Sequence, residues 1–153
     1  MTKRWKFEFE LEPSTIANVR RQIGQIIENE GGAPEVEAEI EVAVGEILLN
    51  ASHHAYHGRS GPLQIEVSLD HGRLEILIHD HGAPLTTPPT IPRSRPIRVS
   101  EGMGLYMVGR LMDEAEIIHP AKDARGTAVR LVKNLHLSPS PEDDDADEPL
   151  DGT

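Results

Sequence analysis

The sequence predicts an α+β protein, a two-layer α/β sandwich in which helices cover one face of a mixed, mostly antiparallel sheet. Three observations lead to this fold class. Apolar and polar residues alternate near the N-terminus and again in a central hairpin, which is the pattern of half-buried strands. Two stretches between those segments carry apolar residues three and four positions apart, the spacing of amphipathic helices. Another helical stretch and two short strand-like stretches follow a long proline-rich segment.

Each element has its own local signal. The first helical stretch opens with a Pro-Ser pair and stops at two glycines, and the second stops before Gly58. An Asp-His-Gly turn joins the two halves of the hairpin. The expected elements are a strand at 5–11, helices at 13–31 and 34–56, a hairpin at 63–78, a helix opened by residues 102–104, and strands at 115–119 and 127–133.

Residues 82–101 contain five prolines and little periodicity. A long loop inside a compact domain is often a lid or a binding segment, so we expect a lid here.

Composition and charge limit the remaining possibilities. The chain has 153 residues, a formal net charge of −11 and no cysteine, so one domain without disulfides is expected. Seven of the 26 acidic residues follow Lys133, where there is no Lys or Arg, which leaves 19 acidic against 15 basic residues before it. The folded part therefore gives no argument for binding nucleic acid or anionic membranes. We expect a folded domain at 1–136 and a disordered acidic tail at 137–153.

No apolar run approaches the roughly 20 residues of a membrane helix. The first ten residues also lack the apolar stretch of a signal peptide. A cytoplasmic protein is therefore expected.

The second helix carries the first group of candidate site residues. Glu46 and Asn50 are four residues apart and share a helix face, and His54 continues the row. Such a row is often only a solvated polar face. The alternative is an amide oxygen that binds Mg²⁺ together with phosphate oxygens, beside a carboxylate that accepts a proton from a hydroxyl group or water.

Three glycine-containing segments form the second group. Asp80 follows a strand, where its carboxylate is placed to accept a hydrogen bond from an exocyclic amine, and Gly82 lets the chain turn close to a flat ligand. Gly102 and Gly104 open a helix, whose free N–H groups attract anions. Gly126-Thr127 precedes the last strand. Taken singly, these segments are also compatible with an ordinary turn or a flexible loop–helix junction.

In chain order the pieces are ExxxN on a helix, DxG after a strand, a lid, GxG opening a helix and GT before a strand. This order resembles the ATP-binding fold shared by gyrases and histidine kinases. Over roughly residues 5–135 the local sequence is similar to that of one branch, the bacterial anti-sigma factor serine/threonine kinases. The matching positions are Glu46, Asn50, Ala51, His54 and Tyr56, then Gly102, Gly104, Leu105, Val108, Leu111, Met112, Asp113 and Glu114, and finally Gly126, Thr127, Val129, Arg130, Leu131 and Lys133.

The resemblance implies two cofactors, ATP and Mg²⁺. It implies that Asn50 coordinates Mg²⁺ and that Glu46 is the general base for a protein serine or threonine. Asp80 would accept the adenine amino group, with Gly82 beside the ring and Thr127 supporting the contact. The other members of the implied binding set are His54, Gly102, Met103, Gly104 and Leu105. One lid arginine among Arg93, Arg95 and Arg98 would reach the γ-phosphate. Spacing does not choose among the three, and Arg98 is the one named in the set.

The implied function is phosphorylation of an anti-sigma factor antagonist on Ser or Thr, combined with sequestration of a sigma factor in a homodimeric regulator of transcription. The chain departs from the fold's DxGxG motif, because it reads Asp-His-Gly-Ala-Pro at 80–84 and Pro84 stiffens the start of the lid.

Two other functions stay open. One is a catalytically inactive ATP-binding module that only switches partners. The other is a Zn²⁺ or Ni²⁺ site that uses His53 and His57, four residues apart, or His79 and His81.

Overall fold

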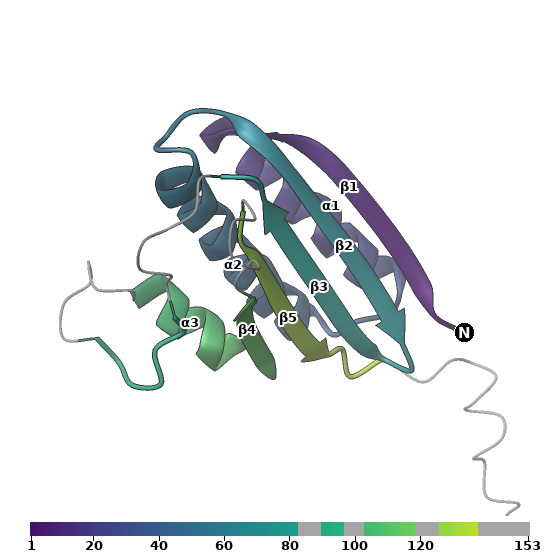
Figure 1. Cartoon of the computed structure of the whole chain (residues 1–153). Coiled ribbons are helices and arrows are strands. Elements are labelled where there is room, and N and C mark those ends of the chain that lie inside the picture. Colours follow the sequence, from purple (N-terminus) through teal and green to yellow (C-terminus); the bar gives the residue numbers. More distant parts are fainter. Residues whose placement is uncertain (83–89, 97–102, 119–125, 138–153) are drawn as a thin grey trace, which may run out of the picture.

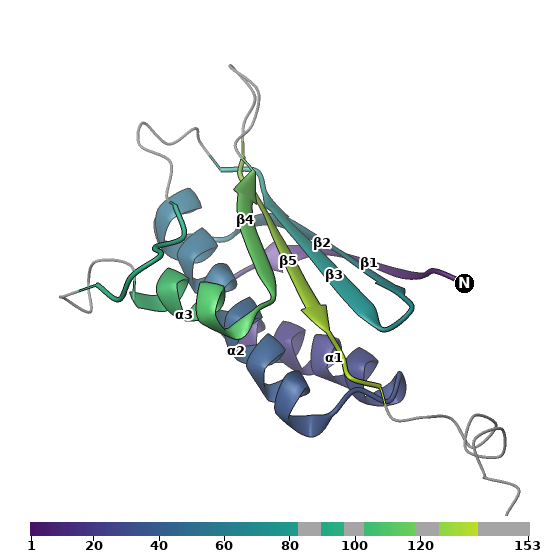
Figure 2. The same ribbon diagram turned by 90° about the horizontal axis from the view of Figure 1, so that it is seen from below.

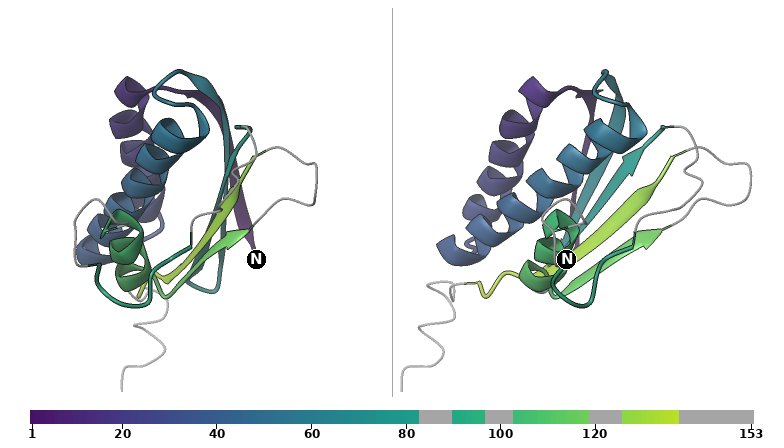
Figure 3. Two further views of the ribbon diagram at one scale, coloured as in Figure 1. Left: turned by 60° about the vertical axis from the view of Figure 1, so that its left-hand side comes forward. Right: turned by 90° about the vertical axis from the view of Figure 1, so that its left-hand side faces the viewer.

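The computed structural model describes residues 1–82, 90–96, 103–118 and 126–137 of the chain. Five strands form one sheet in the order β1-β2-β3-β5-β4, and three α-helices lie against one of its faces (Figures 1 and 3). All strand pairings in the described part are antiparallel, so the expected α+β sandwich is confirmed without the parallel pairing of a mixed sheet. The strands are β1 (Lys3–Leu11), β2 (Gly61–Asp70), β3 (Arg73–Asp80), β4 (Glu114–Ile118) and β5 (Ala128–Asn134).

The central hairpin follows directly from its turn residues. His71 and Gly72 both have positive φ angles, 51° and 78°, as a two-residue turn of type I′ requires. This turn sets the register, so Ile65 pairs with Ile78 and Val67 with Ile76. The buried side chains of both strands therefore face the same layer of helices.

The helices are η1 (Pro13–Thr15, a 3₁₀ turn), α1 (Ile16–Asn29), α2 (Pro34–Asn50), η2 (Ala51–Ala55, a π-helical turn) and α3 (Met103–Leu111). The helix predicted at 34–56 thus changes character after Asn50. The Tyr56 N–H donates to the carbonyl of Ala51, five residues back, at 3.2 Å. Such a bond defines a wider π turn, which apolar periodicity cannot predict.

The hydrophobic core fills the space between the helices and the sheet. α1 packs beside α2, and α2 contacts α3 in turn (Figure 2). Aliphatic side chains dominate, as the 3% aromatic content predicts. None of the helices in the described part of the chain is both long and apolar enough to cross a membrane.

A buried lysine links α2 to the C-terminal end of α3. Lys133 on β5 is only 9% exposed and lies on the helix-covered face, opposite Leu74. Its Nζ donates to Glu39 Oε2 of α2 at 2.9 Å and to the carbonyl of Leu111, the last residue of α3. The N-terminal half of α2 therefore meets the C-terminal end of α3, so the two helices run antiparallel.

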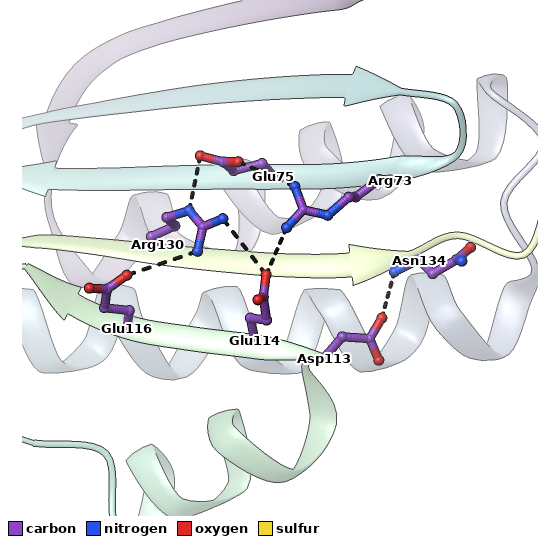
Figure 4. A network of polar contacts seen from close by, with 7 residues as sticks. All are labelled: Arg73, Glu75, Asp113, Glu114, Glu116, Arg130 and Asn134. Carbon is purple, nitrogen blue, oxygen red and sulfur yellow. Dashed lines mark hydrogen bonds and ion pairs between the residues drawn. The ribbon is translucent and has the colours of Figure 1, made fainter.

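On the opposite face of the sheet, two arginines form ion pairs with glutamates of the neighbouring strands (Figure 4). Arg130 lies 3.2 Å from Glu75, 3.7 Å from Glu114 and 3.9 Å from Glu116, and Arg73 lies 2.8 Å from Glu114. Val132 pairs with Glu75 and Glu114 across the strands and is only 3% exposed. The aliphatic parts of these long side chains thus shield Val132 where the described helices do not reach.

Replacing Lys133 by Met tests the link between α2, α3 and β5. The substitution keeps the aliphatic stem but removes the donor to the Leu111 carbonyl and to Glu39. We expect the free energy of unfolding to fall by about 1–3 kcal/mol, measured by urea denaturation. Lys6→Met is the control, because the Lys6–Glu8 pair at 3.5 Å is more than half exposed and should change stability by less than about 0.5 kcal/mol. Equal losses in the two variants would contradict the role of Lys133.

Candidate functional site

Three of the predicted site residues meet at one end of the sheet. Asp80 is the last residue of β3 and continues the strand's buried face, with 8% of its surface exposed. Its Oδ1 accepts the backbone N–H groups of Gly82 at 3.0 Å and Thr127 at 3.2 Å. The Asp80 N–H in turn donates to the Thr127 carbonyl at 3.0 Å. The carboxylate therefore ties the end of β3 to the residue that precedes β5.

The second carboxylate oxygen of Asp80 has a different environment. Both backbone N–H groups that bind this carboxylate donate to Oδ1. No other donor from the described residues binds Oδ2. Burial raises the pKa of Asp80, and the two backbone hydrogen bonds and the neighbouring His79 and His81 oppose that rise. A buried acceptor with one unused oxygen is suited to bind a neutral donor such as an exocyclic amine.

The glycines around Asp80 are required by protein neighbours. Gly126 has a φ of 96°, and a Cβ there would overlap the Asp80 carbonyl oxygen. Gly82 is buried, and a Cβ there would lie 2.6 Å from the Cβ and 2.9 Å from the Cα of Ala55 in η2. The sequence suggested a ligand ring beside Gly82. The structure shows in addition a tight contact with η2, which sequence spacing could not reveal.

A second group forms where α2 passes the start of α3. Because the helices are antiparallel, Glu46 lies beside Gly104, seven residues from Glu39 and Leu111 respectively. A Cβ on Gly104 would overlap the carboxylate of Glu46. The atom that approaches Gly104 in this structure is thus the carboxylate oxygen of the predicted general base.

Asn50 and His54 differ in how well the structure supports their predicted alignment with Glu46. Asn50 is the half-buried last residue of α2, one regular turn after Glu46, so these two share a face as predicted. His54 lies in the wider turn η2 and is exposed. The four-residue spacing that aligns side chains in an α-helix does not hold there.

The structure gives less information on the remaining predicted binding residues. Leu105 is 8% exposed and belongs to the hydrophobic core, so its described contacts are those of packing. Met103 is the half-buried first residue of α3. Arg98 and Gly102 lie outside the described residues.

Arg93, another lid arginine, lines a cavity of about 500 Å³ between residues 90–93, α3 and β4. Tyr106, Gly109 and Arg110 line the same cavity. Helical spacing places these three away from the α3 face that carries Gly104. Arg93 therefore lies on the opposite side of α3 from Glu46.

Sequence reasoning assigned no role to Tyr56, although it is one of the matching positions. Its hydroxyl donates to the carbonyl of Pro62 and accepts the backbone N–H of His81 at 2.7 Å. The ring lies so close to Gly61 that a Cβ there would overlap it. These partners are 5 to 25 residues away along the chain, so no local pattern could have indicated them.

The histidines do not gather into a metal site in the part of the chain that the structure describes. That part contains no group of three or more His, Asp or Glu side chains able to hold a metal ion. The His79 and His81 rings lie 4.6 Å apart and tilted by 44°. His53 and His57 are exposed. The transition-metal alternative thus receives no support from the described residues.

The fold is that of a histidine kinase-like ATPase domain. The family model described as Histidine kinase-like ATPase domain matches residues 9–133, and the chain belongs to this family. It is 26% identical, over 128 residues and 78% of each chain, to a protein named serine-protein kinase RsbW from Bacillus mycoides (strain KBAB4). This relative confirms the resemblance that the motifs indicated.

Solved structures support the same fold. The crystal structure of the RsbU and RsbW domains of Rv1364c from Mycobacterium tuberculosis matches with a TM-score of 0.65 and 23% identity. That match covers 90% of this chain and 34% of the other, so this chain spans about a third of that longer protein. The catalytic domain of the histidine kinase ThkA matches with a TM-score of 0.50 and 13% identity, over 88% of this chain and 99% of that domain.

Asp80→Asn tests the cost of the buried carboxylate. The amide oxygen still accepts both backbone N–H groups, while the buried charge is removed, so we expect stability at pH 7 to be equal or higher. Because the native pKa is raised, the folded wild type holds its proton more tightly than the unfolded chain does. Its stability should therefore fall as the pH rises from about 4 through the raised native pKa, and the variant should lose this fall.

Urea midpoints measured between pH 4 and pH 7 check this expectation. Glu66→Gln, at an exposed position of β2, is the control and should keep the wild-type profile. A loss of more than about 1 kcal/mol at pH 7 in Asp80→Asn would mean that the carboxylate stabilises the fold instead.

Proposed function

We propose that this chain is an ATP-dependent protein serine/threonine kinase that also acts as an anti-sigma factor. It would phosphorylate an anti-sigma factor antagonist on Ser or Thr and sequester a sigma factor, so that transcription is regulated by partner switching. The observation that carries the proposal is the position of the Glu46 carboxylate against the first turn of α3. A proton acceptor at the positive end of a helix lies where an anionic phosphate chain would bind.

ATP fits the two groups of site residues. Asp80 offers an acceptor for the adenine amino group, and the loop around it is fixed by Thr127 and Gly82. The start of α3 offers backbone N–H groups to the phosphates. Asn50 lies on α2 between these two groups, and its amide oxygen is a suitable ligand for Mg²⁺. Bound Mg²⁺ would supply charge neutralisation for the phosphates.

The residues of the chain would then promote transfer as follows. Glu46 accepts the proton of the attacking serine or threonine hydroxyl. The hydroxyl oxygen forms a bond to the γ-phosphorus, and the bond from that phosphorus to the bridging β–γ oxygen breaks, leaving ADP. The phosphorylated partner gains a charge of about −1.5 to −2, which separates an interface that tolerated the neutral side chain.

The wider setting follows from the same resemblance. We propose a cytoplasmic homodimer whose catalytic domain spans 1–136 and whose acidic tail, 137–153, is dispensable for ATP binding. Residues 138–153 lie outside the described part of the chain. Direct binding to nucleic acid or membranes is not part of the proposed function.

A second candidate is a module that binds ATP and a partner without catalysis. Pro84 in place of the second motif glycine favours it, because proline stiffens the start of the segment expected to close over the nucleotide. Phosphotransfer itself separates the two candidates.

Two variants on α2 test binding and catalysis separately. In calorimetric titrations with ATP and Mg²⁺, Asn50→Ala should weaken affinity about tenfold or more, because a ligand to the metal is lost. Glu46→Gln should keep its ATP affinity. It should transfer labelled γ-phosphate to a candidate antagonist protein at least about 100-fold more slowly, since general-base catalysis contributes that much.

Glu35→Gln, at an exposed position in the first turn of the same helix, is the control for both assays. Absence of wild-type binding at about 1 mM ATP would refute the nucleotide site, because a complex of only about −4 kcal/mol would half-form there. Full phosphotransfer by Glu46→Gln would refute the base assignment alone.

Gly104→Ala probes the contact between the proposed base and α3. The added Cβ overlaps the end of a flexible side chain, so the carboxylate can move aside at little cost. Alanine also favours a helix by about 1 kcal/mol over glycine. We therefore expect stability to be kept or raised while phosphotransfer falls at least about tenfold, because the base is displaced. Gly109→Ala is the control in the same helix, because among the described residues its Cβ would meet the side chain of Ile91, at 2.8 Å, and not Glu46. Equal activity in both variants would contradict the expectation.

A further inference from the structure

Tyr56 connects three segments that meet beside Asp80. It follows η2 directly, its hydroxyl donates to the Pro62 carbonyl in β2, and it accepts the N–H of His81 just after β3. The ring covers Gly61, where a side chain would not fit. One side chain thus holds the end of a helical segment, the start of one strand and the end of the next.

The connection bears directly on the loop at 80–82. His81 is held by the Tyr56 hydroxyl, and Gly82 is packed against Ala55. His81 and Gly82 are therefore held by Tyr56 and by Ala55, the last residue of η2, respectively. Asp80 directly precedes His81 and Gly82, and its Oδ1 accepts the Gly82 N–H at 3.0 Å. The orientation of its carboxylate consequently depends on where Tyr56 holds the loop.

The other end of η2 is joined to Asn50. The π-helical turn Ala51–Ala55 therefore forms the whole connection along the chain between Asn50 and the Tyr56 anchor. If the hydroxyl of Tyr56 is removed, the Ala55–Gly82 contact remains but the His81 N–H loses its acceptor. The loop then gains freedom relative to α2, while Glu46 and Asn50 keep their place in the helix.

We propose that Tyr56 is a positioning residue for the adenine end of the site: through His81 it holds Asp80 in the orientation that accepts the adenine amino group. The inference rests on the proposed ATP site. Tyr56 acts through Asp80 and does not contribute to the phosphate end. Burial raises the pKa of the Tyr56 hydroxyl, so it stays a donor to Pro62 across the neutral range.

Tyr56→Phe tests this assignment because it removes the hydroxyl and keeps the ring over Gly61. Three probes are titrated into the full chain: ATP with Mg²⁺, adenosine, and inorganic tripolyphosphate with Mg²⁺. We expect affinity for ATP and adenosine to fall about 5- to 10-fold, the effect of about one hydrogen bond. Affinity for tripolyphosphate should stay within about twofold, because that probe does not reach Asp80. Tyr106→Phe, at the other tyrosine of the chain, should leave all three affinities unchanged.

A double-mutant cycle separates positioning from general stability. In the Asp80→Asn background, Tyr56→Phe should produce no further loss of adenosine affinity, because the group that Tyr56 orients is already altered. Equal losses of affinity for adenosine and tripolyphosphate in Tyr56→Phe would overturn the proposal. Additive losses of adenosine affinity in the cycle would also overturn it. Both conclusions hold even if Tyr56→Phe has a lower melting temperature than the wild type. Wild-type protein that binds none of the probes would overturn the nucleotide site itself. Wild-type binding with an unaffected Tyr56→Phe would overturn only the role of Tyr56.

Discussion

The antiparallel packing of α3 against α2 is the constraint on which the site depends. Lys133 links the two helices from the sheet, because its buried Nζ binds Glu39 on one helix and the last carbonyl of the other. Seven residues along each helix from this link, Glu46 meets Gly104. The Lys133 link and the contact between Glu46 and Gly104 thus lie at opposite ends of the same antiparallel helix pair. Had α3 run in the opposite direction, its N–H groups would point away from the carboxylate.

Three of the motif glycines have close neighbours within the protein before any ligand is considered. Gly126 admits the carbonyl of Asp80, Gly82 admits Ala55, and Gly104 admits the Glu46 carboxylate. In each case the protein itself occupies the space of a Cβ. A nucleotide role for the same positions adds a second constraint, because backbone N–H groups that are free of side chains are also those that phosphates approach. The two constraints favour glycine at the same positions.

Local pattern predicted most of the fold. Alternation placed β1–β3 and the hairpin, and three-to-four spacing placed α1, α2 and α3, because these signals arise within a few residues. The pairing of Glu46 with Asn50 was predictable for the same reason. The π-helical turn, the Tyr56 hydrogen bonds and the Gly82–Ala55 contact were not, because each depends on partners brought near by the tertiary fold. The same limit applies to the π-helical turn that contains His54 and to the strand directions, since all described pairs of the expected mixed sheet are antiparallel.

The two ends of the site are supported in different ways. At the Asp80 end, hydrogen bonds from Gly82 and Thr127 and the Tyr56 anchor join β3, β5 and η2 into one unit. At the Glu46 end, α3 is tied by Lys133 at its last residue, while its first residues meet α2 through a carboxylate and a glycine. A side chain with rotatable bonds yields more readily than a set of backbone hydrogen bonds. The described contacts therefore hold the Asp80 end through several backbone hydrogen bonds, whereas the start of α3 meets α2 through one flexible side chain.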